Sequence, residues 1–147
     1  MCLQLQSTLN QCIDINSPVL FNKYILNLDK NIVYNDGYFY FNCNGIYHIN
    51  WWVTLNNPNS NCSFKISSCK GHSIEGCSSN INKQIFGDGL ITVSDSHLKL
   101  SLINNSTSKI LLSQCNNIKA NISIFKLNYS SNPIIHMPKY QSSLYFK

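Results

Sequence analysis

The chain has 147 residues, a formal net charge of +5, seven cysteines and no arginine. This length suits a single domain. Its lysines are scattered and no arginine is present to fork onto phosphate or guanine, so nucleic-acid binding is not expected. No window approaches the ~20 apolar residues of a membrane span, and the amino terminus lacks the basic and apolar regions of a secretory signal.

In chain order, residues 1–18 are predicted to form an amino-terminal arm that precedes the first strand. Between residues 19 and 128, short apolar or aromatic runs alternate with clusters of Asn, Gly, Ser and Asp, which is typical of an all-β sandwich or barrel. Residues 129–147, interrupted by two prolines, are predicted to form a carboxy-terminal arm. The expected strands are 19–21, 31–34, 38–42, 45–55, 62–66, 84–86, 90–93, 98–103, 110–114 and 118–127.

The stretch YFYF at residues 38–41 is aromatic at every position. Alternate side chains of a strand lie on opposite faces, so Tyr38 and Tyr40 must face away from Phe39 and Phe41. With the aromatic residues of 47–52, a monomer would expose an apolar patch of unusual size. The pattern therefore predicts that a neighbouring subunit covers the second face.

Eight residues lie at intervals that match a known signature: Phe21, Asn27, Ile32, Phe39, Gly45, Tyr47, Ile49 and Trp51. On these residues the chain resembles the C1q-like domain, a branch of the C1q and tumour-necrosis-factor jelly-roll family. Ile32 and Ile49 replace aromatic residues of the signature but stay large and apolar. The strand expected at 118–127 also resembles the closing strand of that family, whereas residues 56–97 do not align.

The resemblance implies a jelly-roll β-sandwich of about ten antiparallel strands that associates as a homotrimer, with one sheet facing the threefold axis. The residues then expected at the trimer interface are Tyr38, Tyr40, His48 and Trp52. Those expected in the sandwich core are Phe21, Phe39, Tyr47, Ile49, Trp51, Leu98, Leu100 and Leu102. Among bacterial proteins, the chain is most similar to the head domains of collagen-like glycoproteins of the spore exosporium, although it has no Gly-X-Y repeat.

Catalytic constellations are absent from the sequence pattern. Most of the six acidic residues fall in expected turns such as NDG and GDG, and no nucleophile, base and acid are grouped, so neither an enzyme nor a cofactor is predicted. Residues 67–82 are expected to form a long polar loop. A zinc site could use Cys62, Cys69, His72 and Cys77, but their spacing is not that of paired knuckles, and disulfides among these loop thiols are the favoured alternative.

Two functions compete at this stage. The first is a structural homotrimer of a surface fibre or layer on a cell or spore, whose partners are further copies and other spore-coat proteins. In that hypothesis Cys2 and Cys12 of the amino-terminal arm crosslink neighbouring subunits; alternatively they pair within one chain or stay reduced. The second function is a recognition head that binds a glycan or receptor through loops 56–61 and 67–82.

Overall fold

The computed structural model describes residues 2–56, 62–77, 83–94 and 97–127. Every regular element in this part of the chain is a β-strand, and none of it is a helix able to cross a membrane. The strands form two five-stranded antiparallel sheets and one small two-stranded sheet. The prediction of an all-β jelly-roll sandwich is confirmed.

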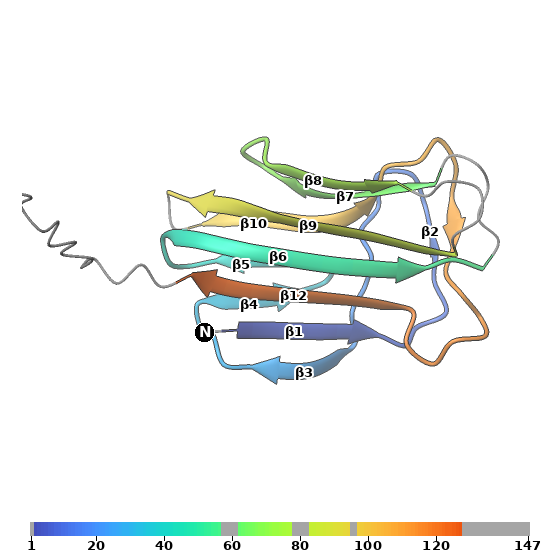
Figure 1. Cartoon of the computed structure of the whole chain (residues 1–147), viewed down its shortest axis with the longest axis horizontal. Helices are drawn as coiled ribbons and strands as arrows, with labels where there is room; N and C mark the ends of the chain where they lie inside the picture. The colour runs from blue at the N-terminus through green and yellow to red at the C-terminus, as the bar shows by residue number, and fades with distance from the viewer. Residues whose placement is uncertain (1, 57–61, 78–82, 95–96, 128–147) are drawn as a thin grey trace, which may run out of the picture.

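One sheet, called here the β6 sheet, has the order β3-β1-β12-β6-β9. Its bounds in that order are Lys23–Asn27, Cys2–Ser7, Ala120–Leu127, Gly45–Thr54 and Gln84–Val93. The other, the β10 sheet, has the order β4-β5-β10-β7-β8, with bounds Ile32–Asn35, Tyr38–Phe41, Leu98–Asn104, Ser63–Ser68 and Ser73–Cys77. The small sheet pairs β11 (Ile110–Leu111) with β2 (Cys12–Ile13). Figure 1 shows the β6 sheet in front, with strands β4, β5 and β10 behind it.

The core lies between the two large sheets and follows the alternation of each strand. All eight side chains expected there are buried: Phe21, Phe39, Tyr47, Ile49, Trp51, Leu98, Leu100 and Leu102. Aromatic contacts connect the sheets; the rings of Phe41 on β5 and Tyr47 on β6 meet edge to face with centroids 4.8 Å apart. The aromatic alternation therefore directs one parity of both strands into a shared core.

The amino-terminal segment is part of the sandwich, so the prediction of an arm over residues 1–18 is wrong there. Strand β1 pairs with β12 on one side and with β3 on the other. Leu3 and Leu5 are buried in the core, whereas Gln4 and Gln6 face outward and are half-buried. The alternation LQLQ suits a strand with one buried and one solvent-facing side. The strand pairs on both sides within the sheet of its own chain.

The strand expected at residues 19–21 is displaced along the chain. Val19 donates its amide hydrogen bond to Leu102 O in the β10 sheet, and Pro18 forms an isolated bridge with Ile103. The regular strand is β3, at the open edge of the β6 sheet, where all five side chains are exposed. Exposed edge residues carry no alternating burial signal, so the sequence pattern does not reveal this strand.

Two further elements differ from the expected pattern. Strand β8 forms a hairpin with β7 inside the stretch expected to be a polar loop. The segment QIFGDGLITV, expected as two strands with a GDG turn, is the single strand β9, paired with β6 over its full length. Gly87 and Gly89 face inward in this strand, and Asp88 faces outward. The glycines leave room for core side chains and do not form a turn.

The carboxy-terminal arm expected at 129–147, and most of the expected 56–61 loop, lie outside the described residues.

Candidate self-association face

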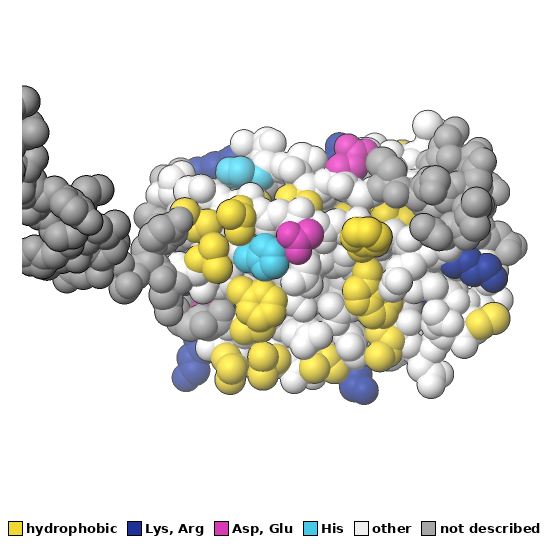
Figure 2. Space-filling model, in the orientation of Figure 1, with side chains coloured by type: hydrophobic (Ala, Val, Ile, Leu, Met, Phe, Trp, Pro, Cys, Tyr) yellow, Lys and Arg dark blue, Asp and Glu magenta, His cyan; other side chains and the backbone are white. Residues whose placement is uncertain are grey.

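The outer face of the β6 sheet carries large apolar side chains in contact with solvent. On β9, Phe86 is 72% and Leu90 is 61% exposed. Phe125 and Leu127 on β12 are also exposed, and the neighbouring Trp52 on β6 is half-buried. Figure 2 shows hydrophobic side chains spread over this face. Exposed apolar surface of this kind marks an interaction site when it is contiguous.

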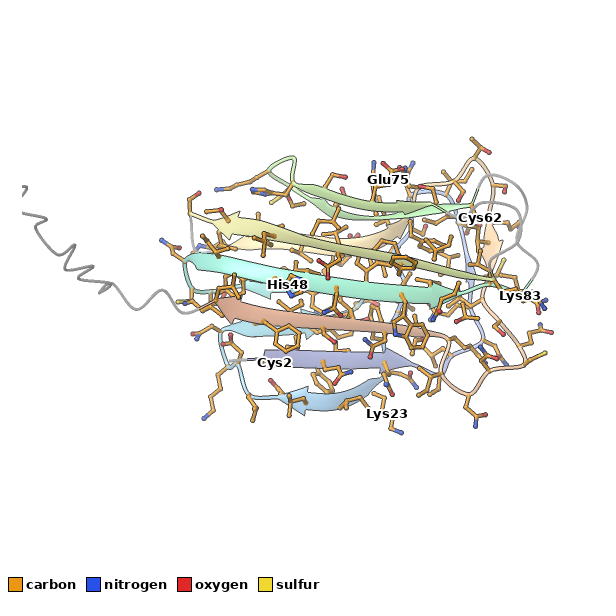
Figure 3. The ribbon with its side chains drawn as sticks, viewed as in Figure 1. Cys2, Lys23, His48, Cys62, Glu75 and Lys83 are labelled. Carbon is orange, nitrogen blue, oxygen red and sulfur yellow. The ribbon has the colours of Figure 1, made fainter. Side chains whose placement is uncertain are left out.

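A histidine and a carboxylate form a hydrogen-bonded pair among these apolar side chains. His48 Nε2 lies 2.9 Å from Asp88 Oδ2 and 3.0 Å from Oδ1. The imidazole also stacks on the ring of Phe125, with centroids 6.2 Å apart. Figure 3 places His48 on β6, near the middle of the sheet. Among the outward-facing described residues of β6, β9 and β12, these two are the ionisable groups, and Lys23 on the edge strand β3 adds a cation at the margin of the same face.

The polar side chains at the centre of the face bind one another. Gln4 Nε2 donates to Asn121 Oδ1 at 3.0 Å, and Asn121 Nδ2 donates to Ser123 Oγ at 3.4 Å. Asn121 and Ser123 are buried even in the single chain. Because these groups already have partners, covering the face with another protein surface leaves few hydrogen bonds unmade.

The four residues expected at the interface do not lie on one face, which corrects that prediction. His48 and Trp52 lie on the outer face of the β6 sheet, but Tyr38 and Tyr40 lie on β5, on the outer face of the β10 sheet. Lys99, on the adjacent β10, places its Nζ 3.7 Å from the Tyr38 ring centroid and 5.7 Å from that of Tyr40. The chain itself therefore partly covers the second aromatic face, through cation–π contacts.

The β10 sheet has a shallow, open depression on its outer side. Its volume is about 280 Å³, and its lining residues are Tyr38, Ser67, Ser68, Cys69, Lys99, Leu100 and Ser101. It contains no paired acid and base, and in the described residues no three His, Cys, Asp or Glu side chains are close enough to hold a metal ion.

Two of the loop thiols, Cys62 and Cys69, lie at opposite ends of strand β7. Cys62 is buried just before β7, and Cys69 is exposed just after it. The six-residue strand separates them by roughly 20 Å, whereas a disulfide needs Cα atoms about 4.4–6.8 Å apart. A disulfide between these two, or a zinc site that uses both, is therefore wrong. The backbone of Cys77 lies opposite Ser63, at the Cys62 end of the hairpin.

The two cysteines assigned to the arm lie within strands. Cys2 is buried at the start of β1, and Cys12 is exposed on β2. Burial of Cys2 raises the pKa of its thiol, which opposes the thiolate needed for disulfide exchange. The expected crosslink through both residues stays a prediction, and the position of Cys2 does not favour it.

Sequence reasoning missed several residues of the apolar face. The sequence pattern assigns Phe86 and Leu90 to two separate strands and Asp88 to the turn between them, because GDG is a common turn sequence. The signal that could have found them is the alternation of IFGDGLITV, in which Phe, Asp, Leu and Thr share one parity if the glycines belong to the strand.

The two sheets and their antiparallel order define the class of fold as a jelly roll, and solved structures agree. The chain is similar to the globular domain of zebrafish complement 1qA protein, with a TM-score of 0.69, 14% identity, and 86% of this chain and 97% of that chain covered. It is similar to murine APRIL, with a TM-score of 0.69, 12% identity, and coverage of 86% and 98%. It is also similar to Eiger TNF from S. frugiperda, with a TM-score of 0.66, 13% identity, and coverage of 90% and 96%.

No family model and no curated protein matches the sequence. At these identities the structural likeness shows the fold alone, which is the C1q/TNF-like jelly roll.

Proposed function

We propose that the protein is a self-assembling structural subunit, without enzymatic activity, that forms a homotrimer through the outer face of its β6 sheet. The observation that carries the proposal is the exposure of Phe86, Leu90 and Phe125 around one internally paired histidine and carboxylate. The C1q and tumour-necrosis-factor domains that the sequence resembles associate as trimers through one sheet of the sandwich, which supports the same arrangement here.

The size of the face fits this role. The five strands are 5 to 10 residues long. At about 3.3 Å per residue and about 4.8 Å between strands they give an area of roughly 600 Å², which is comparable with the ~800 Å² that each partner buries in a typical stable interface. Burying a Phe or Leu side chain contributes about 1.5–3 kcal/mol each. Phe86 and Leu90 alone would therefore contribute several kcal/mol if a second copy covered them.

Introducing a charged residue on this face tests the trimer. Leu90→Asp places a carboxylate in the proposed interface, where an unpaired charge costs several kcal/mol. Val33→Asp is the matched control, because Val33 is exposed on β4 of the opposite sheet. Light scattering after size-exclusion chromatography should give about three times the chain mass of 16.7 kDa for wild type and the control, and one chain mass for Leu90→Asp.

A monomeric wild type, or a Leu90→Asp variant that remains trimeric, would contradict the proposal. Thermal unfolding of each variant, followed by circular dichroism, separates loss of association from loss of fold.

The assembly that we propose for these trimers is a fibre or layer on the surface of a bacterial cell or spore. Its support is the resemblance to exosporium head domains together with thiols at the surface, such as Cys12 and Cys115. Negative-stain microscopy of the purified protein, and immunogold labelling of spores, test it. Filaments or labelled spore surfaces support the structural role, whereas discrete trimers that bind sugars on a glycan array would favour a recognition head.

A further inference from the structure

A lysine and a cysteine far apart in sequence lie in direct contact at one end of the sandwich. Lys126, near the end of β12, donates a hydrogen bond from Nζ to Cys43 Sγ at 2.8 Å. Cys43 is half-buried in the turn between β5 and β6. Strand β12 pairs with β6 so that Lys126 lies opposite Tyr47, which brings the ammonium group back over the turn. The sheet pairing therefore sets this contact.

A glycine makes room for the lysine. A Cβ atom on Gly45 would lie 2.7 Å from Lys126 Cε, which is closer than real Cβ atoms approach. Gly45 also has a φ of +153°, in a region that residues with side chains rarely adopt. Tyr47 Oη donates to the carbonyl oxygen of Cys43 at 2.8 Å and holds the turn in place. The surroundings of Cys43 thus keep a path open for the lysine side chain.

The electrostatics of this end of the sandwich keep Lys126 charged. The hydrogen bond to Cys43 raises the pKa of the Lys126 ammonium, and the negative charge of Asp29 adds to the effect. Asp29 is fully buried, and among the described residues its Oδ2 has no hydrogen-bond partner. The Lys126 ammonium is therefore placed to stabilise negative charge that develops on the Cys43 sulfur when it acts as a nucleophile.

We propose that Cys43 and Lys126 form a thiol-exchange site that reacts with small disulfides such as oxidised glutathione. The Cys43 thiolate attacks one sulfur of the disulfide, a new bond forms between them, and the original S–S bond breaks. The second half of the disulfide leaves as a thiolate with the electron pair, so Cys43 is oxidised and the small molecule is reduced. Lys126 keeps its proton throughout. The chemistry does not depend on self-association.

The other thiols of the chain provide an internal reference. Cys2 and Cys62 are buried. Cys12 is exposed on β2, and in the described residues no lysine donates a hydrogen bond to its sulfur. If accessibility alone set the reaction rate, Cys12 would react faster than the half-buried Cys43. If the contact with Lys126 sets the reaction rate, Cys43 reacts faster than Cys12.

The experiment measures the rate at each cysteine of the reduced, full-length chain. Oxidised glutathione is added near neutral pH, samples are quenched in acid, and peptide mass spectrometry gives the fraction of each thiol converted. We expect Cys43 to react about five to ten times faster than Cys12, because the Lys126 ammonium that contacts Sγ stabilises negative charge on the sulfur as it attacks. Lys126→Met should lower the Cys43 rate to that of Cys12 or below it, and Lys126→Arg should retain most of the wild-type rate.

Lys109→Met removes an equal charge from an exposed site and serves as the control, with all rates unchanged. A wild-type Cys43 that reacts no faster than Cys12 would overturn the proposal without any variant. So would a folded Lys126→Met protein in which Cys43 keeps the wild-type rate.

Discussion

Trp51 packs its indole ring against the backbone of two glycines. A Cβ atom on Gly87 would lie 2.5 Å from the ring, and one on Gly76 would lie 2.2 Å from Phe86 O. Trp51 is buried, and its Nε1 has no hydrogen-bond partner in the described residues. The ring occupies the space that side chains would otherwise fill, so the identity of single residues controls how closely the strands approach.

Gly87→Ala should therefore destabilise the fold by about 1–3 kcal/mol, the usual cost of overpacking a core. Gly89→Ala is the graded control, because its new Cβ would meet the end of the Ile74 side chain at 3.0 Å, and that end can move. Urea unfolding should give Gly87→Ala the lower free energy of unfolding. Equal free energies of unfolding for the two variants would show that the Trp51 ring moves aside as easily as the Ile74 side chain.

Tyr34 joins three segments through its hydroxyl group. Tyr34 Oη accepts hydrogen bonds from the amides of Phe21 at 2.7 Å and Gly37 at 3.2 Å. Burial raises the pKa of Tyr34 above 10.0, more than these donors lower it. The folded state thus holds this proton more tightly than the unfolded state, so the stabilisation is complete below pH 10.0 and is lost as pH rises through the folded-state value.

Tyr34→Phe should lose about 1–2 kcal/mol of stability at pH 8, since both amides lose a partner. The gap between wild type and variant should narrow at higher pH, because only wild type has the Tyr34 proton to lose. Urea unfolding at pH 8 and above pH 10 measures both effects, with Tyr40→Phe on the outer face of β5 as control. A gap that stays constant with pH would rule out this role of the hydroxyl.

At the scale of elements, β1 stabilises the sheet from an interior position. It lies between β3 and β12, and the residues that pair with β12 run from Cys2 to Ser7. An interior strand satisfies backbone groups on both of its sides, so its loss exposes two ladders of unpaired amides. The amino-terminal residues are therefore required for the domain.

Leu5→Asp should unfold the protein or prevent its soluble expression. Leu5 is 0% exposed, and an unpaired buried charge costs several kcal/mol of a total stability of about 5–15 kcal/mol. Gln6→Asp is the matched control on the same strand, where the side chain faces outward opposite Lys23, and it should change stability by less than about 0.5 kcal/mol. Similar melting temperatures for Leu5→Asp and wild type would show that the domain folds without β1 packed in the core.

At the scale of the whole molecule, the two outer faces of the sandwich differ. The β6 sheet exposes Phe86 and Leu90 around the hydrogen-bonded pair His48 and Asp88, whereas the aromatic side chains of β5 are partly covered by Lys99 of the same chain. A second copy that covers the β6 sheet removes apolar surface from water, which is the main source of association energy. The same contact with the β10 sheet would compete with the lysine contacts already made. Because of this difference between the faces, Leu90→Asp is expected to be a monomer and Val33→Asp to remain a trimer.

Much of the sandwich could be predicted because burial imposes a period of two on each strand. Residues such as Leu98, Leu100 and Leu102 alternate with polar neighbours, and all three are buried. The pattern fails where a strand lacks that period. The side chains of β3 are exposed on both faces, and β9 contains glycines whose usual place is a turn.

By itself, the sequence determined the class of fold, the core and the aromatic strands, because alternation is a local property that each strand carries alone. Only the tertiary structure decided that Cys2–Ser7 enters its own sheet, that Asp88 meets His48, and that Lys126 reaches Cys43. Those contacts join residues 40 or more positions apart, and they depend on strand order and register. No local pattern fixes either, because register is set by the packing of whole sheets against each other.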